Sequence, residues 1–262
     1  MPPGSARHWS WFFAAPELRA PLLGIFALWA EWQALMDPAT ETSVAHLKLA
    51  WWQEEIRRLI AGLAVHPIGV YLASLPGAGT ADFTPLLAAL DAAAAHVSGV
   101  PLERAADLEP LSQALWGAPL TLASSLAGHD ADLPGIGRCT AALAAGEFLS
   151  RAVHDYRRQA RSGRTSFAVD ELLAAGVENA DLLADPPPAH LRDYLHRLRE
   201  RAADYFETAA RMLPKTQRAP DRHLLVLAAL GRSRMQNAAA RPGGRMLKDM
   251  LLAWSTARGA HR

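Results

Sequence analysis

The sequence has little of several features that define common protein classes. It contains one cysteine, Cys139, among 262 residues, so no disulfide can form within the chain. Its 27 basic residues are balanced by 26 acidic ones, and the net charge of +1 is not the basic excess typical of nucleic-acid binders. The longest apolar run, residues 21–30, is about half as long as a membrane span requires. These absences predict a cytoplasmic protein with no nucleic-acid partner and no transmembrane segment, and they leave peripheral membrane contact open.

Alanine and leucine are abundant, β-branched residues are scarce, and half of all residues are hydrophobic. No stretch alternates polar and apolar residues long enough to make a strand. The sequence therefore predicts an all-α fold, with one domain over residues 1–262 and flexible ends at 1–8 and 258–262. Turn signals divide the chain into about nine helical segments.

The positions of proline, glycine and capping residues predict where these segments lie. Pro16 suits the first turn of a helix that runs to Asp37-Pro38. Further helices are expected over about 43–62, from His66-Pro67, from 80 or 82 to 98, and from Pro101 to about 126. A polar loop at 128–135 precedes a long helix to about Arg161. The remaining helices are expected near 170–175, after the three prolines at 186–188, from 220 and from about 245.

Three segments of the chain carry a family resemblance. The first contains Phe12-Phe13, Arg19 and the stretch from Ile25 to Glu31; the second runs from Lys48 to Glu55 and continues to His66-Pro67; the third runs from Gly163 to Leu172 and ends at Gly176-Val177. Their order and spacing, over about residues 10–215, resemble the squalene/phytoene synthases, which are head-to-head prenyl transferases. The Trp51-Trp52 helix and the His-Pro step are similar to those of bacterial relatives of a mitochondrial complex I assembly factor in the wider family.

The resemblance implies an isoprenoid-synthase-like helical bundle around a central cavity. In this family two DxxxD motifs on facing helices hold magnesium, which binds the diphosphate of the substrate. A spacing of four places both carboxylates of a motif on one helix face. Magnesium prefers oxygen ligands, and it neutralises the charge of the leaving diphosphate.

Both motifs are half present in this sequence. The first becomes Gln33 and Asp37, and the second becomes Asp155 and Gln159. A glutamine offers a neutral oxygen and is a poorer magnesium ligand than an aspartate. Asp37 and Asp155 are the candidate catalytic and metal-binding residues, and Glu31 is a candidate third metal ligand.

Each of these candidates also has a structural interpretation. Asp37 can end a helix before Pro38, and Asp155 can pair with Arg151 or Arg158. Glu31 can be an ordinary solvated side chain.

Arginines gather around the second motif. Arg151, Arg158 and Arg164 are candidate diphosphate-binding residues, because guanidinium groups pair well with phosphate oxygens. With Arg157 and Arg161, they can instead form a solvated basic helix end, which is favourable in its own right. Trp51 and Trp52 are expected to pack in the core rather than to stack on a substrate.

Two functional hypotheses follow from the resemblance. The first is a degenerate, non-catalytic family member that needs no cofactor and either binds an isoprenoid diphosphate or lipid or acts on a protein partner as an assembly factor. The alternative is an active, magnesium-dependent prenyl transferase that condenses isoprenoid diphosphates, with Glu31, Asp37 and Asp155 on the metal and Arg164 on the diphosphate. An unrelated helical protein without a central cavity remains the third reading.

Overall fold

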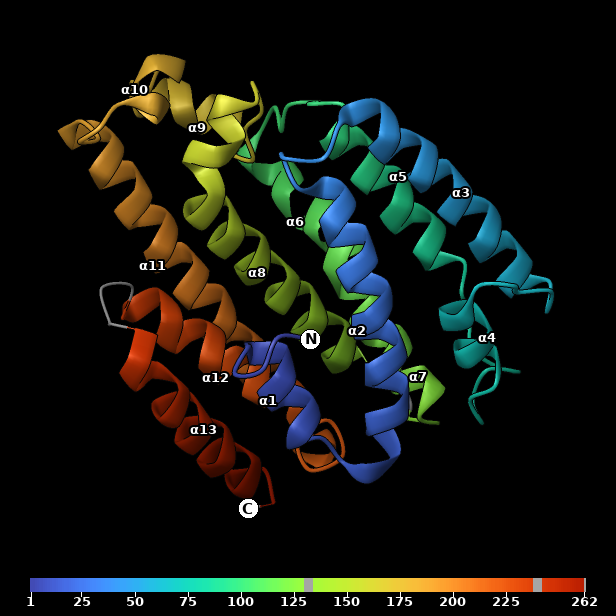
Figure 1. The fold of residues 1–262 in the computed structure, drawn as a ribbon. Coiled ribbons are helices and arrows are strands. Elements are labelled where there is room, and N and C mark those ends of the chain that lie inside the picture. The colour runs from blue at the N-terminus through green and yellow to red at the C-terminus, as the bar shows by residue number, and fades with distance from the viewer. Residues whose placement is uncertain (130–133, 238–241, 262) are drawn as a thin grey trace.

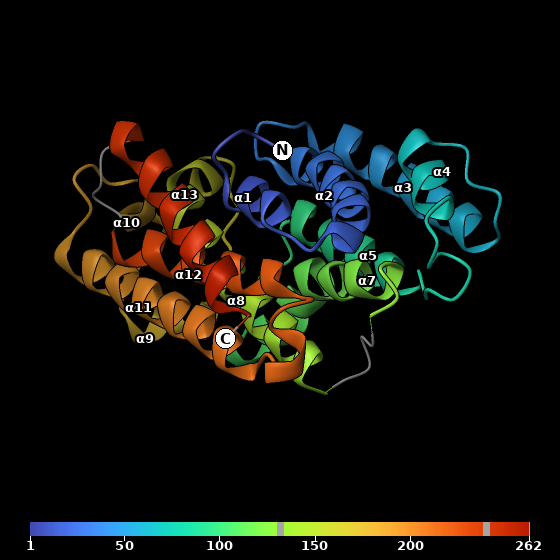
Figure 2. The same ribbon diagram turned by 90° about the horizontal axis from the view of Figure 1, so that it is seen from below.

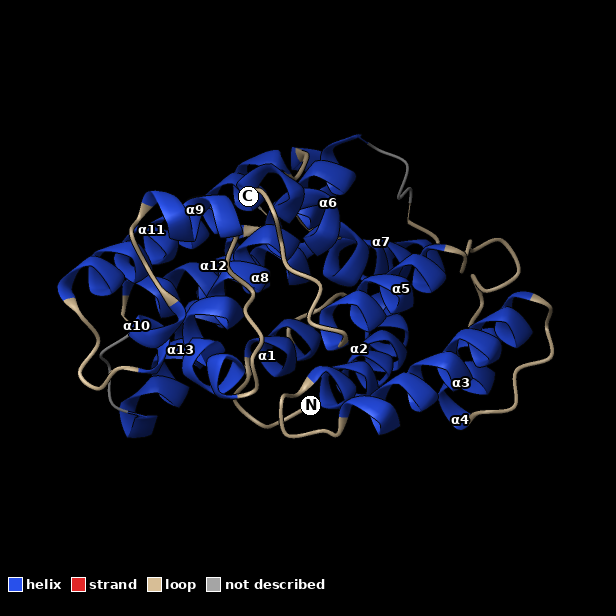
Figure 3. Cartoon of the chain, turned by 90° about the horizontal axis from the view of Figure 1, so that it is seen from above, coloured by secondary structure: helices blue, strands red, loops and turns tan. Residues whose placement is uncertain are grey.

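A computed structural model describes residues 1–129, 134–237 and 242–261. Within these ranges the chain consists of helices and loops, and the β-type pairing found there is an isolated bridge between Leu102 and Ala168 (Figure 3). The predicted all-α fold is confirmed. The α-helices are α1 (Ala6–Phe12), α2 (Pro16–Met36), α3 (Thr42–Ile60), α4 (Pro67–Ala73), α5 (Pro85–Val97), α6 (Leu108–Ser112), α7 (Ala118–Leu126), α8 (Pro134–Arg161), α9 (Val169–Ala174), α10 (Asn179–Leu183), α11 (Ala189–Met212), α12 (Arg222–Gln236) and α13 (Pro242–Gly259).

Helix α8 runs through the middle of the bundle, with α11 on one side and α2 on the other (Figure 1). Its close packing against α11 and α12 depends on glycine. A Cβ atom at Gly146 of α8 would lie 2.9 Å from the ring of Phe206 in α11, and one at Gly231 of α12 would lie 2.5 Å from it. The buried phenylalanine therefore fills the space that two missing side chains leave.

The two ends of the chain meet on one side of the bundle. Helix α1 contacts α12 and α13 (Figure 2). Trp9 packs with Val226, Leu230, Ala253 and Ala257 in a small apolar cluster. The residues expected to be flexible, 1–8 and 258–262, thus overlap with α1 and with the end of α13. Helix α1 begins after Ser5, whose side-chain oxygen accepts a hydrogen bond from the backbone N–H of His8 at 3.1 Å.

The single helix predicted from Pro101 to about residue 126 is wrong. Residues before Ala105 are extended, because the carbonyl oxygen of Leu102 accepts a hydrogen bond from the backbone N–H of Val169 at 2.8 Å. The chain then forms a 3₁₀ turn at Ala105–Asp107, helix α6, a π-helical turn at Gln113–Gly117 and helix α7. Pro110 and Pro119 lack an N–H group, which weakens a continuous helical hydrogen-bond ladder.

The other long helices lie where the sequence predicts them. Residues 130–133 of the predicted polar loop lie outside the described residues, and α8 begins directly after them. Helices α1 and α10 were not predicted, since the first helix was expected to begin at Pro16. No helix in the described ranges combines the length and the apolar character that crossing a membrane would need.

Candidate functional site

A cavity of about 260 Å³ lies between the last turn of α2 and the second half of α8. It is lined by Gln33, Ala34, Met36, Asp37, Pro38, His96, Leu115, Trp116, Phe148, Arg151, Asp155, Arg158, Gln159 and Ser166. Both half-motifs therefore face the same space, as the resemblance implies. Gln33 and Asp37 lie one helical turn apart on α2, and Asp155 and Gln159 lie one turn apart on α8.

A single arginine joins the two remaining aspartates. Nη1 of Arg158 lies 3.0 Å from Oδ2 of Asp37, and Nη2 lies 3.1 Å from Oδ1 of Asp155. Asp37 also ends α2, because its Oδ1 accepts a hydrogen bond from the backbone N–H of Ala39 at 2.9 Å. The guanidinium group of Arg158 thus lies between the two facing helices and binds both of the carboxylates that a metal ion there would need.

Both glutamines are engaged in other contacts. Oε1 of Gln33 accepts a hydrogen bond from Nη1 of Arg7 at 3.0 Å. Gln159 is buried, and its Oε1 accepts a hydrogen bond from the hydroxyl of Ser166 at 2.8 Å. The neutral oxygens that replace the missing carboxylates are therefore already used by side chains of the protein.

A second ionic cluster lies next to the cavity. Oε1 of Glu147 lies 2.9 Å from Nε of Arg151 and 3.5 Å from Nη2 of Arg7. The guanidinium group of Arg7 also lies over the ring of Trp29, 4.6 Å from its centre, and that of Arg151 lies 5.2 Å from the ring centre of Trp116. Arg7 is thereby tied to α2 and α8 together.

Charges in this cluster shift one another's pKa values. Burial, and then the positive charge of Arg151, lower the pKa of Arg7 to about 10, so that its side chain is still protonated at neutral pH. Burial opposes ionisation of Glu147, but the two arginines outweigh it and hold the pKa of this carboxyl below its ordinary value. Arg7 was not predicted as a site residue, because residues 1–8 were expected to form a flexible end. The helix-capping residue Ser5 was the available signal for a helix there.

The other predicted site residues are placed differently. Glu31 is exposed on α2 and does not line the cavity. Arg161 is exposed at the end of α8, and Arg157 pairs with Asp185 at 3.1 Å. Neither Trp51 nor Trp52 lines the cavity; Trp52 is buried in the core, and Trp51 is half exposed beside it. Cys139 is buried, and burial raises the pKa of its thiol to about 12, which leaves it unreactive.

Arg164 does not itself line the cavity, but its charge acts on His96, which does, and it keeps an unused donor. Its Nη1 is buried without a hydrogen-bond partner in the described part of the chain. His96 lines the cavity, and burial together with the positive charge of Arg164 lowers its pKa to about 4. His96 is therefore neutral at physiological pH, and Arg164 is the one of the three predicted diphosphate-binding arginines that is not already paired with a carboxylate in the described ranges.

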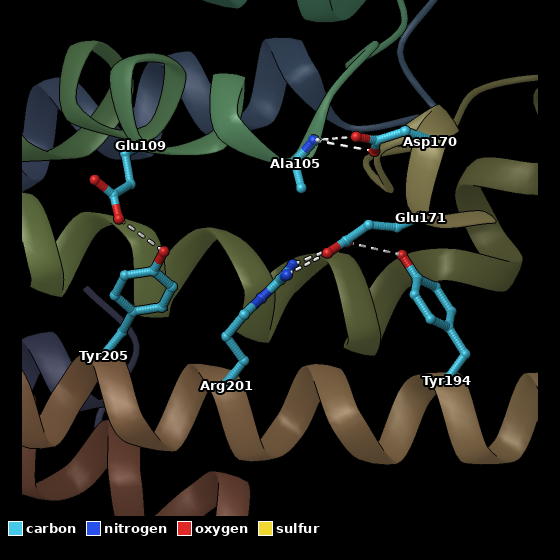
Figure 4. Close-up of polar contacts among 7 residues, drawn as sticks. All are labelled: Ala105, Glu109, Asp170, Glu171, Tyr194, Arg201 and Tyr205. Carbon is cyan, nitrogen blue, oxygen red and sulfur yellow. Dashed lines mark hydrogen bonds and ion pairs between the residues drawn. The ribbon is translucent and has the colours of Figure 1, made fainter. Parts of the chain in front are cut away.

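A polar clamp holds the segment that carries Arg164 and Ser166. Figure 4 shows Arg201 reaching from α11 to Glu171 of α9, with Nη2 of Arg201 3.0 Å from Oε2 of the glutamate. The hydroxyl of Tyr194 donates to the same carboxylate at 3.3 Å. Asp170 accepts a hydrogen bond from the backbone N–H of Ala105 at 3.0 Å. These contacts fix α9, and with it the cavity-lining Ser166 just before it, against α11 and the 3₁₀ turn.

The donor set does not fit a magnesium ion. Magnesium requires oxygen ligands at about 2.0–2.1 Å in near-octahedral geometry. The two aspartates instead share the single positive charge of Arg158, and Gln33 and Gln159 bind Arg7 and Ser166. In the described part of the chain, no three histidine, cysteine, aspartate or glutamate side chains lie close enough together to share a metal.

The fold and the cavity define an isoprenoid-synthase-type helical bundle whose charged cavity lies between two facing helices. The sequence model of the squalene/phytoene synthase family matches residues 3–258, and the chain belongs to this family.

Two of the solved structures that are similar to it are a dehydrosqualene synthase and a squalene synthase. One is a dehydrosqualene synthase in complex with a ligand, with a TM-score of 0.70 and 13% identity over 97% of this chain and 92% of that one. The other is the squalene synthase HpnC from Alicyclobacillus acidocaldarius, with a TM-score of 0.67 and 18% identity over 97% of this chain and 88% of that one. At these identities the likeness supports the fold alone. No curated protein sequence matches the chain.

Proposed function

We propose that this chain is a non-catalytic member of the squalene/phytoene synthase family that binds a single isoprenoid or lipid without magnesium. The observation that carries the proposal is the double ion pair of Arg158 with Asp37 and Asp155. An arginine held between the only two carboxylates that line the described cavity opposes the entry of a cation, because the cation would have to displace a positive charge of the protein itself. On this proposal the chain resembles the degenerate, assembly-factor branch of the family.

The size of the cavity supports one ligand rather than two. Pockets for drug-sized ligands usually measure about 300–1,000 Å³. A cavity of about 260 Å³ is small even for one such ligand, whereas head-to-head condensation needs two prenyl chains at once. The apolar side chains Met36, Leu115, Trp116 and Phe148 would contact the hydrocarbon part of the ligand.

The charged end of the cavity supports an anionic headgroup held by arginine. Arg164 has a buried, unused N–H donor, and Arg151 lines the cavity beside the ring of Trp116. A guanidinium group can bind phosphate oxygens through two parallel hydrogen bonds and needs no metal to do so. We therefore infer that a prenyl phosphate or diphosphate would bind with its headgroup toward Arg164.

Calorimetric titration of farnesyl diphosphate, with and without magnesium, tests this proposal. We expect the same affinity in both conditions, weaker binding of farnesol, and no release of inorganic diphosphate. Arg164→Gln should weaken the binding of the diphosphate, because it removes the buried, unused donor, whereas Arg161→Gln, at an exposed arginine at the end of α8, should leave it unchanged.

Other outcomes would reject the proposal in distinct ways. Binding that requires magnesium, with turnover, would establish the active prenyl transferase. Absence of binding in both conditions would leave the fold as a scaffold, and a protein partner would then be sought, as for an assembly factor.

A further inference from the structure

Helix α13 exposes three large apolar side chains on the face that points away from the protein. Leu247, Leu251 and Trp254 recur at spacings of four and three, which places them in one stripe, and their exposed fractions are 60%, 52% and 46%. The opposite face is attached to the bundle by Ala253 and Ala257, which are buried. Figure 2 shows α13 as an outer helix that lies over α12 and beside α1. An ordinary surface helix carries polar side chains on its outer face, whereas α13 is apolar on its outer face as well as on the face toward the core, where Met250 and Leu252 also pack.

The exposed charged side chains that the structure describes on α13 are all basic. Lys248 and Arg258 are exposed, and the guanidinium group of Arg258 lies 4.8 Å from the ring centre of Trp254. The one acidic residue in the sequence of α13, Asp249, is 4% exposed and pairs with Arg234 at 2.7 Å. The solvent face of α13 thus offers apolar side chains and positive charge, and its negative charge is buried and neutralised.

We propose that α13 docks the protein onto an anionic lipid surface. A helix with this pattern lies in the plane of the interface, with its apolar stripe at the boundary between headgroups and acyl chains. Tryptophan favours this depth, and lysine and arginine are attracted by anionic headgroups. The surface is separate from the cavity between α2 and α8, so the proposal does not rest on the ligand of that cavity (Figure 1).

Another exposed apolar region lacks this charge pattern. Helix α3 exposes Leu47 and Trp51, but Glu54 is exposed on the same helix and pairs with Arg57 and Arg58. Its outer face therefore carries an exposed carboxylate beside the basic side chains of Lys48 and Arg57, whereas the one carboxylate of α13 is buried. The observations therefore favour α13 as the lipid-binding face.

Co-sedimentation of the full chain with lipid vesicles tests this proposal. We expect binding to vesicles that contain phosphatidylglycerol and much weaker binding to pure phosphatidylcholine. Leu251→Gln and Trp254→Gln should each weaken binding about tenfold, because each removes an apolar side chain from the interface. Lys248→Gln should weaken binding to the anionic vesicles about fivefold, since one cation near such a surface contributes about that factor. Leu173→Gln is the matched control, because Leu173 is 75% exposed on α9 and lies outside the stripe.

Three outcomes would overturn the proposal. The first is no binding to anionic vesicles while circular dichroism shows a folded protein. The second is binding that Leu251→Gln and Trp254→Gln leave unchanged, or that is as strong on neutral vesicles. The third is self-association of the wild-type chain in solution that Leu251→Gln abolishes, without vesicle binding, which would assign the stripe to contact between copies of the chain.

Discussion

Replacement of Arg158 by glutamine is the most direct perturbation of the cavity. The side chain is about half exposed, at 52%, so that solvent screens its ion pairs with Asp37 and Asp155. Each screened pair contributes at most about 1 kcal/mol, and their joint loss should cost about 1 kcal/mol. For a chain of this size that corresponds to a fall in melting temperature of about 2–4 °C.

Magnesium should then affect the variant differently from the wild-type chain. Arg158→Gln leaves two carboxylates facing one cavity without a cation between them, which favours binding of a divalent ion. If the ion binds with a Kd of about 1 mM, about 10 mM magnesium would stabilise the variant by about 1.4 kcal/mol, enough to restore the lost melting temperature. The wild-type chain should show no such response.

Thermal unfolding monitored by circular dichroism, with and without magnesium, measures both effects. Arg161→Gln is the matched control on the same helix, because Arg161 is exposed and does not line the cavity. An equal magnesium-induced rise in the melting temperature of the wild-type chain and of Arg158→Gln would refute the reasoning, since it would mean that Arg158 does not exclude the ion.

Three further predictions concern stability. His223 is fully buried, and burial lowers its pKa to about 4, whereas in the unfolded chain it would take up a proton near pH 6.5. Lowering the pH from 6.5 to 4 should therefore reduce the unfolding free energy by about 3 kcal/mol through this residue. Urea unfolding of His223→Leu should lack that part of the pH dependence. Gly231→Ala should cost about 1–3 kcal/mol, because its Cβ would lie 2.5 Å from the ring of a buried phenylalanine, whereas Gly137→Ala, with open space around it, should be neutral or slightly stabilising; equal effects in thermal unfolding would contradict this. Arg201→Met should lower the free energy of unfolding by about 1–2 kcal/mol, because it leaves the partly buried carboxylate of Glu171 without its ion pair. A melting temperature within 1 °C of the wild-type value, which corresponds to about 0.3 kcal/mol, would argue against the clamp.

Part of the candidate site could be predicted from the sequence because it depends on helical periodicity. A spacing of four places Gln33 above Asp37 and Asp155 above Gln159 whatever the helices pack against. Periodicity could not show which of two arginines Asp155 would meet. Arg158 is paired with it, whereas Arg151 turns toward Glu147.

The sequence by itself determined the all-α class and the long helices, because proline, glycine and apolar spacing act locally along the chain, and the family resemblance implied the two half-motifs on facing helices. Only the tertiary structure decided how the charges are paired. The contact of Arg158 with Asp37 spans 121 residues, and that of Arg7 with Gln33 joins a terminal helix to the cavity. The segment after Pro101 is extended for the same reason, since its partner is the loop before α9. Interactions between distant residues depend on packing geometry, and no local pattern encodes them.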